Sequence, residues 1–366
     1  MLKLLLFAAV ALLSFANGAN DNFKGVATLW GAGRTTYKRA LAWATAFTFL
    51  GSLAAAFWGA GLAAKFNGSN LVSQETALQL PFLASVILSA SGTVLLASRL
   101  GLPVSTTHAL VGALVGAGIT AAGFAQVHFA ALGRGVILPL LFSPFAALLL
   151  TLAVYPLTKK LVTDHDCICV GEPVALAAVA TVDTTGVAAA SALPAMPEVR
   201  WKSATECATE TSAARFSASD GLHWLSGAAI SFARGLNDTP KIAAVLLVLF
   251  AGAAMRDYLL VAAAIALGGM LGAARVAGTM SKKITPMATP EAVGANLVSA
   301  ALVLMASRLA LPVSTTHVTT GSVFGIGLLR REEADWGRVR DIVLSWVATL
   351  PLAALLAYFF YRLLAR

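Results

Sequence analysis

The chain has 366 residues, of which 58% are hydrophobic and only 12% are charged. Soluble domains carry about a quarter charged residues, so this balance excludes an ordinary soluble domain and indicates a membrane protein. The net charge of +9 would point to nucleic acid in a soluble chain. Here the basic residues lie in short loops, so we expect the lipid bilayer as a partner and no nucleic acid.

Long apolar stretches follow one another along the chain, and most approach the roughly 20 residues that cross a bilayer. They are Ala40–Ala64, Leu80–Ala97, Val136–Leu157, Ile242–Ala254, Tyr258–Ala274 and Ile342–Leu364. We therefore predict an all-α polytopic membrane protein. With about five crossings per half, the basic clusters near residues 34–39, 159–160, 282–283 and 330–340 fall on one side, which the positive-inside rule assigns to the cytoplasm. This predicts a multi-pass protein of the cell (inner) membrane.

Two blocks of the sequence occur twice. Ser14–Lys24 matches Ser231–Lys241 at seven of eleven positions, and Ala97–His108 matches Ala306–His317 at eleven of twelve. Because the blocks recur in the same order, the chain is a duplication. We place a first transmembrane repeat at 1–157 and a second at 218–366. An odd number of crossings per repeat would insert the second copy upside down, giving inverted repeats.

The segment 158–217 between the repeats is rich in Ala, Thr and Ser and contains no convincing span. We interpret it as a hydrophilic, largely flexible cytoplasmic linker. In that reducing compartment its cysteines, Cys167, Cys169 and Cys207, should not form a structural disulfide. Cys167 and Cys169, with Asp164, His165 and Asp166, could bind a metal, but the usual zinc spacings are absent and we expect a plain loop.

The first repeated block places Asn20-Asp21 and Asn237-Asp238 inside apolar stretches. A carboxylate at membrane depth needs a cation, a proton or a polar cavity, so such residues mark ion or substrate routes. The preceding Gly18 and Gly235 would permit the helix to break there, leaving polar backbone groups facing a central site. The alternative is an ordinary helix cap at the membrane surface.

The second block, Leu-Pro-Val-Ser-Thr-Thr-His, occurs at 102–108 and 311–317. Pro103 and Pro312 suit a helix start, with the hydroxyls in or near the first turn. Unpaired N–H groups, the helix dipole and several hydroxyl donors could together bind phosphate or sulfate. Alternatively, the hydroxyls bond to their own helices or mediate packing. His108 and His317 are either structural or proton carriers.

The pairing of Gly-x-Asn-Asp with Pro-Val-Ser-Thr-Thr-His, once in each half around a hydrophilic central segment, resembles the inorganic phosphate transporter (PiT) family. The resemblance implies symport of inorganic phosphate with Na⁺ or H⁺, in some members as a metal–phosphate complex and in a few relatives sulfate transport. It also implies paired half-helix breaks and an anion site whose substrate-binding residues are Asn20, Ser105, Thr106, Thr107, Asn237, Ser314, Thr315 and Thr316.

Electrostatics separates the expected roles within this site. Two aspartates would repel phosphate, so we assign Asp21 and Asp238 to the coupling cation, with the Asn20 and Asn237 amides able to serve either ion. The chain departs from the family pattern by carrying a lysine after each Asn-Asp. Lys24 and Lys241 either complement the substrate charge or are solvated ends, and we count them with His108 and His317 as auxiliary residues.

These patterns predict a secondary active transporter that imports inorganic phosphate by alternating access. A sulfate permease on the same scaffold is the nearest alternative. An anion channel would need a continuous polar lining, and an enzyme built from the histidines and aspartates has no spacing that specifies a reaction. We expect no enzymatic activity, no cofactor beyond Na⁺ or H⁺ as coupling ion, and no resident metal. The sequence leaves a homo-oligomer possible.

Overall fold

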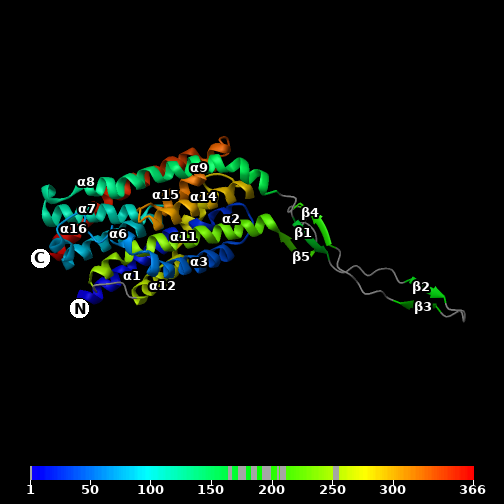
Figure 1. Cartoon of the computed structure of the whole chain (residues 1–366), viewed down its shortest axis with the longest axis horizontal. Helices are drawn as coiled ribbons and strands as arrows, with labels where there is room; N and C mark the ends of the chain where they lie inside the picture. Colours follow the sequence, from blue (N-terminus) through cyan, green and yellow to red (C-terminus); the bar gives the residue numbers. More distant parts are fainter. Residues whose placement is uncertain are drawn as a thin grey trace.

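The computed structural model describes residues 2–163, 167–171, 179–182, 188–191, 199–203, 206, 212–249 and 255–366. Long helices form an elongated bundle, from one end of which the strands of the central segment project (Figure 1). In the part of the chain that is described, seven helical segments are long and apolar enough to span a membrane. The predicted polytopic helical membrane fold is confirmed.

Each half contributes five long helices within the described residues. In the first half these are α1 (Leu2–Asp21), α3 (Tyr37–Trp58), α6 (Leu80–Leu100), α7 (Thr106–Ala122) and α9 (Leu138–Leu161). In the second half they are α11 (Ala218–Leu249), α12 (Met255–Gly272), α14 (Thr289–Arg308), α15 (Thr315–Leu329) and α16 (Trp336–Leu364). Shorter turns join them: η1 (Lys24–Val26), α2 (Ala27–Gly31), α4 (Ala60–Ala63), α5 (Gln74–Leu78), η2 (Phe124–Gln126), α8 (Phe129–Leu132), the π-helical η3 (Gly133–Ile137) and α13 (Ala274–Lys282).

The two halves pack against each other reciprocally. Helix α1 packs on α12, and its counterpart α11 packs on α3. Helix α7 likewise packs on α16, and its counterpart α15 packs on α9. Each of these helix pairs between the halves is therefore matched by a second pair, which is formed by the counterparts of the same two helices. The largest buried apolar cluster combines side chains of α1, α6 and α7 with those of α11 and α12, so the core lies between the halves.

Glycines make these contacts close. A Cβ atom added to Gly18 would lie 1.9 Å from the carbonyl oxygen of Ile265, and one added to Gly235 would lie 2.1 Å from that of Thr48. Small residues at helix interfaces let backbones approach in membranes. The glycines of the Gly-x-Asn-Asp motif therefore act here as close-packing positions between the halves.

The two termini lie at one end of the bundle and the central segment at the other (Figure 1). The basic clusters gather at the end that carries the central segment. Arg34 lies 3.5 Å from Asp220 at the start of α11, and Lys282, Lys283 and Arg338 line one shallow pocket together with Gly31. This arrangement agrees with the charge pattern from which the topology was predicted.

Beyond the end of α9, most of the described residues of the central segment form strands, which differs from the expected flexible linker. Strand β1 (Cys167–Gly171) pairs antiparallel with β4 (Val199–Lys202) and β5 (Ser212–Ser217), while β2 (Val179–Val182) pairs with β3 (Ala188–Ser191). Sequence interpretation missed the strands because small Ala and Thr residues give little alternation of polarity.

The cysteines of this segment also differ from expectation. Cys169 is disulfide-bonded, so the expectation of no disulfide is wrong, and Cys167 beside it is buried. The physical reason is that antiparallel strand pairing folds the segment back on itself and brings distant positions together. Cys207 and the residues 164–166 of the alternative metal site lie outside the described residues.

Candidate functional site

The two copies of the Asn-Asp motif differ in backbone structure. Helix α1 ends at Asp21, and the chain turns before η1 and α2, as a broken helix requires. Helix α11 instead runs without interruption through Asn237 and Asp238, so the break expected in the second copy is wrong. The reason lies in packing: past Asp238 the helix stays in contact with α3, where the Thr239 hydroxyl donates to Ser52 Oγ at 2.7 Å.

The second motif begins a helix in each half, as predicted. Helices α7 and α15 start at the first threonine of the motif, one residue after the capping serine. The Ser105 hydroxyl accepts a hydrogen bond from the backbone N–H of His108 at 3.1 Å, and Ser314 does the same for His317 at 3.1 Å. Both serines are thus N-caps. The two threonine hydroxyls that follow each serine lie in the first turn of its helix.

The aspartates lie against the threonines of their own half. The Thr106 hydroxyl donates to Asp21 Oδ2 over 3.3 Å, and the Thr315 hydroxyl donates to Asp238 Oδ2 over 3.0 Å. Asn17 adds a second donor to Asp21 Oδ2 at 2.9 Å. Hydroxyl and amide donors stabilise the ionised form of a buried carboxylate.

The lysines join the two halves. Lys24 Nζ contacts Asp21 and, at 2.7 Å, the Thr316 hydroxyl of the opposite half. Lys241 Nζ lies 3.3 Å from Asp238 and 2.9 Å from the Thr107 hydroxyl of the opposite half. With exposed fractions of 3% and 2%, neither lysine is a solvated end, so that alternative is wrong.

Asn20 and Asn237 tie each motif to the last turn of the helix that precedes the hydroxyl-rich helix, α6 or α14. The Asn20 amide donates to Ser98 Oγ and to the Leu102 carbonyl, both at 3.0 Å. The Asn237 amide donates to Ser307 Oγ at 2.8 Å. Thus the four segments that were singled out from the sequence meet in one buried cluster, in which the Asp–Thr, Lys–Thr and Asn–Ser contacts of one half each have a counterpart in the other.

Arg234 is a member of this region that sequence reasoning did not identify. Its side chain is 1% exposed, and Nη2 donates to Asn22 Oδ1 at 2.9 Å and to Thr48 Oγ1 at 3.1 Å. Its Nε and Nη1 atoms have no hydrogen-bond partner. The carboxylates of Asp21 and Asp238 both attract the guanidinium. A signal was present in the sequence, because Arg234 replaces Asn17 between otherwise matching blocks and puts a charge at membrane depth.

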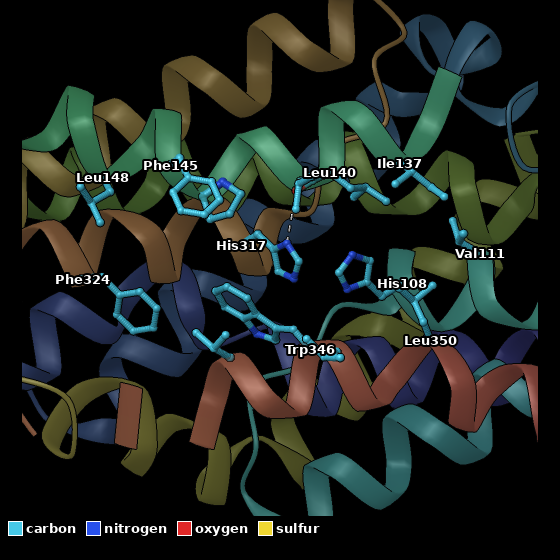
Figure 2. Close-up of a pocket in the computed structure, with 14 residues that line it drawn as sticks. His108, Val111, Ile137, Leu140, Phe145, Leu148, His317, Phe324, Trp346 and Leu350 are labelled. Carbon is cyan, nitrogen blue, oxygen red and sulfur yellow. Dashed lines mark hydrogen bonds between the residues drawn. The ribbon is translucent and has the colours of Figure 1, made fainter. Parts of the chain in front are cut away.

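The two histidines line an apolar cavity of about 340 Å³ between α9, α16 and the hydroxyl-rich helices (Figure 2). Their rings face each other edge to face with centroids 4.3 Å apart, and His317 stacks on Trp346 at 4.0 Å. The indole N–H of Trp346 donates to the Pro103 carbonyl at 3.0 Å. His317 Nδ1 lies 3.5 Å from the Leu140 carbonyl. These contacts favour a structural role, in which the histidines support the start of α7 and α15.

Comparison with known proteins identifies the family of the chain. The model of the phosphate transporter family matches residues 17–357. A "Probable low-affinity inorganic phosphate transporter" of Mycobacterium tuberculosis is 30% identical over 99% of this chain and 78% of its own length. A protein of the same name in Rhizobium meliloti is 27% identical over 97% of this chain and 94% of its own length.

The fold has also been seen in a solved structure, entitled "The sodium-dependent phosphate transporter". The similarity has a TM-score of 0.76 at 22% identity and covers 100% of this chain and 99% of that one. At this identity the similarity establishes the fold. The family model matches nearly the whole chain, and the chain is therefore a member of the phosphate transporter family.

Proposed function

We propose that this chain imports inorganic phosphate through the cell (inner) membrane by secondary active symport with Na⁺ or H⁺. Two inverted halves would alternate access to a midplane site formed by the paired Asn-Asp and Ser-Thr-Thr motifs, with the central segment at the cytoplasmic face. The observation that carries this proposal is Arg234, a buried guanidinium with two unpartnered nitrogens that is attracted by the aspartates of both Asn-Asp motifs.

The charges of the cluster favour an anion. Asp21 pairs with Lys24 and Asp238 pairs with Lys241, so these four groups balance. Arg234 adds one positive charge that no described carboxylate contacts within salt-bridge distance. A buried charge is costly unless it is paired. A phosphate oxyanion would supply both the missing charge and acceptors for Nε and Nη1, in the bidentate geometry that guanidinium groups favour.

The remaining side chains supply complementary functions. The hydroxyls of Thr106, Thr107, Thr315 and Thr316 can donate to phosphate oxygens, with Ser105 and Ser314 holding the helix starts. Asn20 and Asn237 bind the ends of the preceding helices, α6 and α14. We assign Asp21 and Asp238 to the coupling cation. A cation that binds to these carboxylates would change the net charge around the bound anion.

Burial of the cluster favours alternating access over a channel. Asp21 is 1% exposed, Asp238 3% and Arg234 1%, so the site is closed to solvent on every side. Phosphate can reach it only if the halves move. The bonds from Lys24 to Thr316 and from Lys241 to Thr107 cross between the halves, so a rocking motion must break them. An anion channel would instead need a path that stays open.

A sulfate permease is the second candidate on this scaffold. Phosphate near neutrality still has a hydroxyl to donate, whereas sulfate is a dianion without a proton. Acceptors such as the carboxylate oxygens of Asp21 and Asp238 therefore favour phosphate.

The test is uptake of labelled phosphate and labelled sulfate into proteoliposomes that contain the full chain, under separately imposed Na⁺ and H⁺ gradients. We expect phosphate to accumulate and Arg234→Asn to abolish accumulation, while Arg362→Asn, at an exposed position on α16, has no effect. Accumulation of sulfate alone would replace the substrate. Uptake that equilibrates without responding to either gradient would indicate a channel.

A further inference from the structure

The ammonium groups of Lys24 and Lys241 each lie at the centre of an oxygen cage. Around Lys24 Nζ the cage consists of Asn20 Oδ1 at 2.9 Å, the Val104 carbonyl at 3.0 Å, Thr316 Oγ1 at 2.7 Å and the Asp21 carboxylate. Four oxygens of four chemical kinds thus surround one nitrogen. The lysine is 3% exposed, so the cage is closed to bulk solvent.

The second cage repeats the first. Around Lys241 Nζ lie the Val313 carbonyl at 2.7 Å, Thr107 Oγ1 at 2.9 Å, Asp238 Oδ1 at 3.3 Å and the Asn237 side-chain oxygen. Each ligand is the repeat counterpart of a ligand in the first cage. Because both copies preserve the whole set, the arrangement follows from the duplicated sequence and not from one accidental contact.

The ligands are those that a small hard cation would use. Carboxylate, amide oxygen, backbone carbonyl and hydroxyl are the donors of cation sites in proteins, and none of them carries a positive charge. An ammonium group has three N–H donors and no acceptor, so in this cage it stands where a metal cation would stand. A second cation could reach these oxygens only by displacing the ammonium group, which would repel it strongly at this range. The residues present therefore do not fit Na⁺ at these two positions.

We propose that Lys24 and Lys241 are tethered cations that take the place of sodium ions, so that phosphate transport by this chain does not draw on a sodium gradient. The inference rests on the proposed function. It narrows the choice between Na⁺ and H⁺ as coupling ion by removing Na⁺. Each ammonium group neutralises the aspartate of its own half and binds a threonine of the other half. The positive charge that offsets the anion then stays with the protein throughout the transport cycle.

The first test uses the wild-type protein. Uptake of ³²P-labelled inorganic phosphate into proteoliposomes is measured with external Na⁺ and with K⁺ or choline in its place, and thermal unfolding is measured in the three chloride salts. We expect uptake to change by less than about twofold, and Na⁺ to give no stabilisation beyond K⁺. A loss of about tenfold or more without Na⁺, or a stabilisation specific to Na⁺, would overturn the inference.

The second test changes the cages. Lys24→Ala with Lys241→Ala removes both ammonium groups and leaves the oxygens, so this variant should gain sodium-specific thermal stabilisation and sodium-stimulated uptake of about fivefold or more. Lys24→Met with Lys241→Met keeps each side-chain stem in the cage and should gain neither. The matched control changes two exposed lysines, Lys38→Ala with Lys65→Ala, and should behave as wild type. A well-folded double alanine variant that does not respond to Na⁺ would contradict the inference.

The outcomes separate this inference from the proposed function. If the wild type takes up no phosphate under any gradient, the proposed function fails. The thermal measurements on the wild type and the double variants still decide whether the cages hold ammonium in place of Na⁺.

Discussion

Arg234 offers the sharpest prediction, because its two unpartnered nitrogens lie fully buried beside the paired motifs. Arg234→Asn installs the residue that the first repeat carries at the equivalent position, Asn17. Hydrogen bonds to charged groups contribute about 1.5–3 kcal/mol each, so losing two removes about 3–6 kcal/mol of phosphate binding. Since 1.4 kcal/mol corresponds to tenfold, affinity should fall by about two to four orders of magnitude.

The assay is binding of labelled phosphate to the purified protein, together with its thermal unfolding with and without phosphate. An unpaired buried charge does not stabilise the phosphate-free protein, so Arg234→Asn should leave that unfolding temperature unchanged or raise it. It should also abolish the shift that phosphate produces. Arg362→Asn is the matched control. A variant that binds phosphate within about threefold of wild type would refute the assigned role of Arg234.

Three further predictions follow from the packing and the ion pairs. Asp21→Asn leaves Lys24 buried without its counter-ion and should cost about 3–5 kcal/mol of folding free energy. Adding Lys24→Met should restore much of that loss. A double-mutant cycle measured by denaturant unfolding in detergent tests this, and additive losses would show that the ion pair is unimportant. Gly235→Ala places a Cβ atom 2.1 Å from the Thr48 carbonyl oxygen. It should cost about 1–3 kcal/mol or more of folding free energy and lower the unfolding temperature by several degrees. Gly278→Ala, whose Cβ atom would have nothing within 4 Å, should be neutral, and equal effects of the two substitutions would contradict the close-packing role. Trp346→Phe removes the 3.0 Å hydrogen bond to the Pro103 carbonyl. It should cost about 1 kcal/mol of folding free energy and leave phosphate affinity unchanged. An unchanged folding free energy would show that this bond does not support the helix start.

The internal repeat made much of the site predictable. Because both blocks recur in order, the sequence alone pairs Asp21 and Asp238 with the hydroxyl-rich helices. The helix starts at Thr106 and Thr315 followed from Pro and Ser chemistry. These helix starts depend on residues that lie close together in the sequence, so the sequence alone predicts them.

What could not be predicted depends on contacts between the halves. The bond from Lys24 to Thr316 joins residues 292 positions apart, and no sequence pattern specifies which half supplies the partner hydroxyl. The continuity of α11 through Asp238 is equally a matter of packing, since Thr239 beyond the motif bonds to Ser52 of α3. The lysines were therefore open to a solvated interpretation that their burial rules out.

The account depends most on an oxyanion that binds between the halves beside Arg234. The direct measurement is a structure of the full chain determined with phosphate, or with arsenate as a heavier analogue. We predict density for the oxyanion within hydrogen-bond distance of Arg234 Nε and Nη1 and of threonine hydroxyls from both halves. An oxyanion bound elsewhere, with the Arg234 nitrogens still unpartnered, would contradict the central claim.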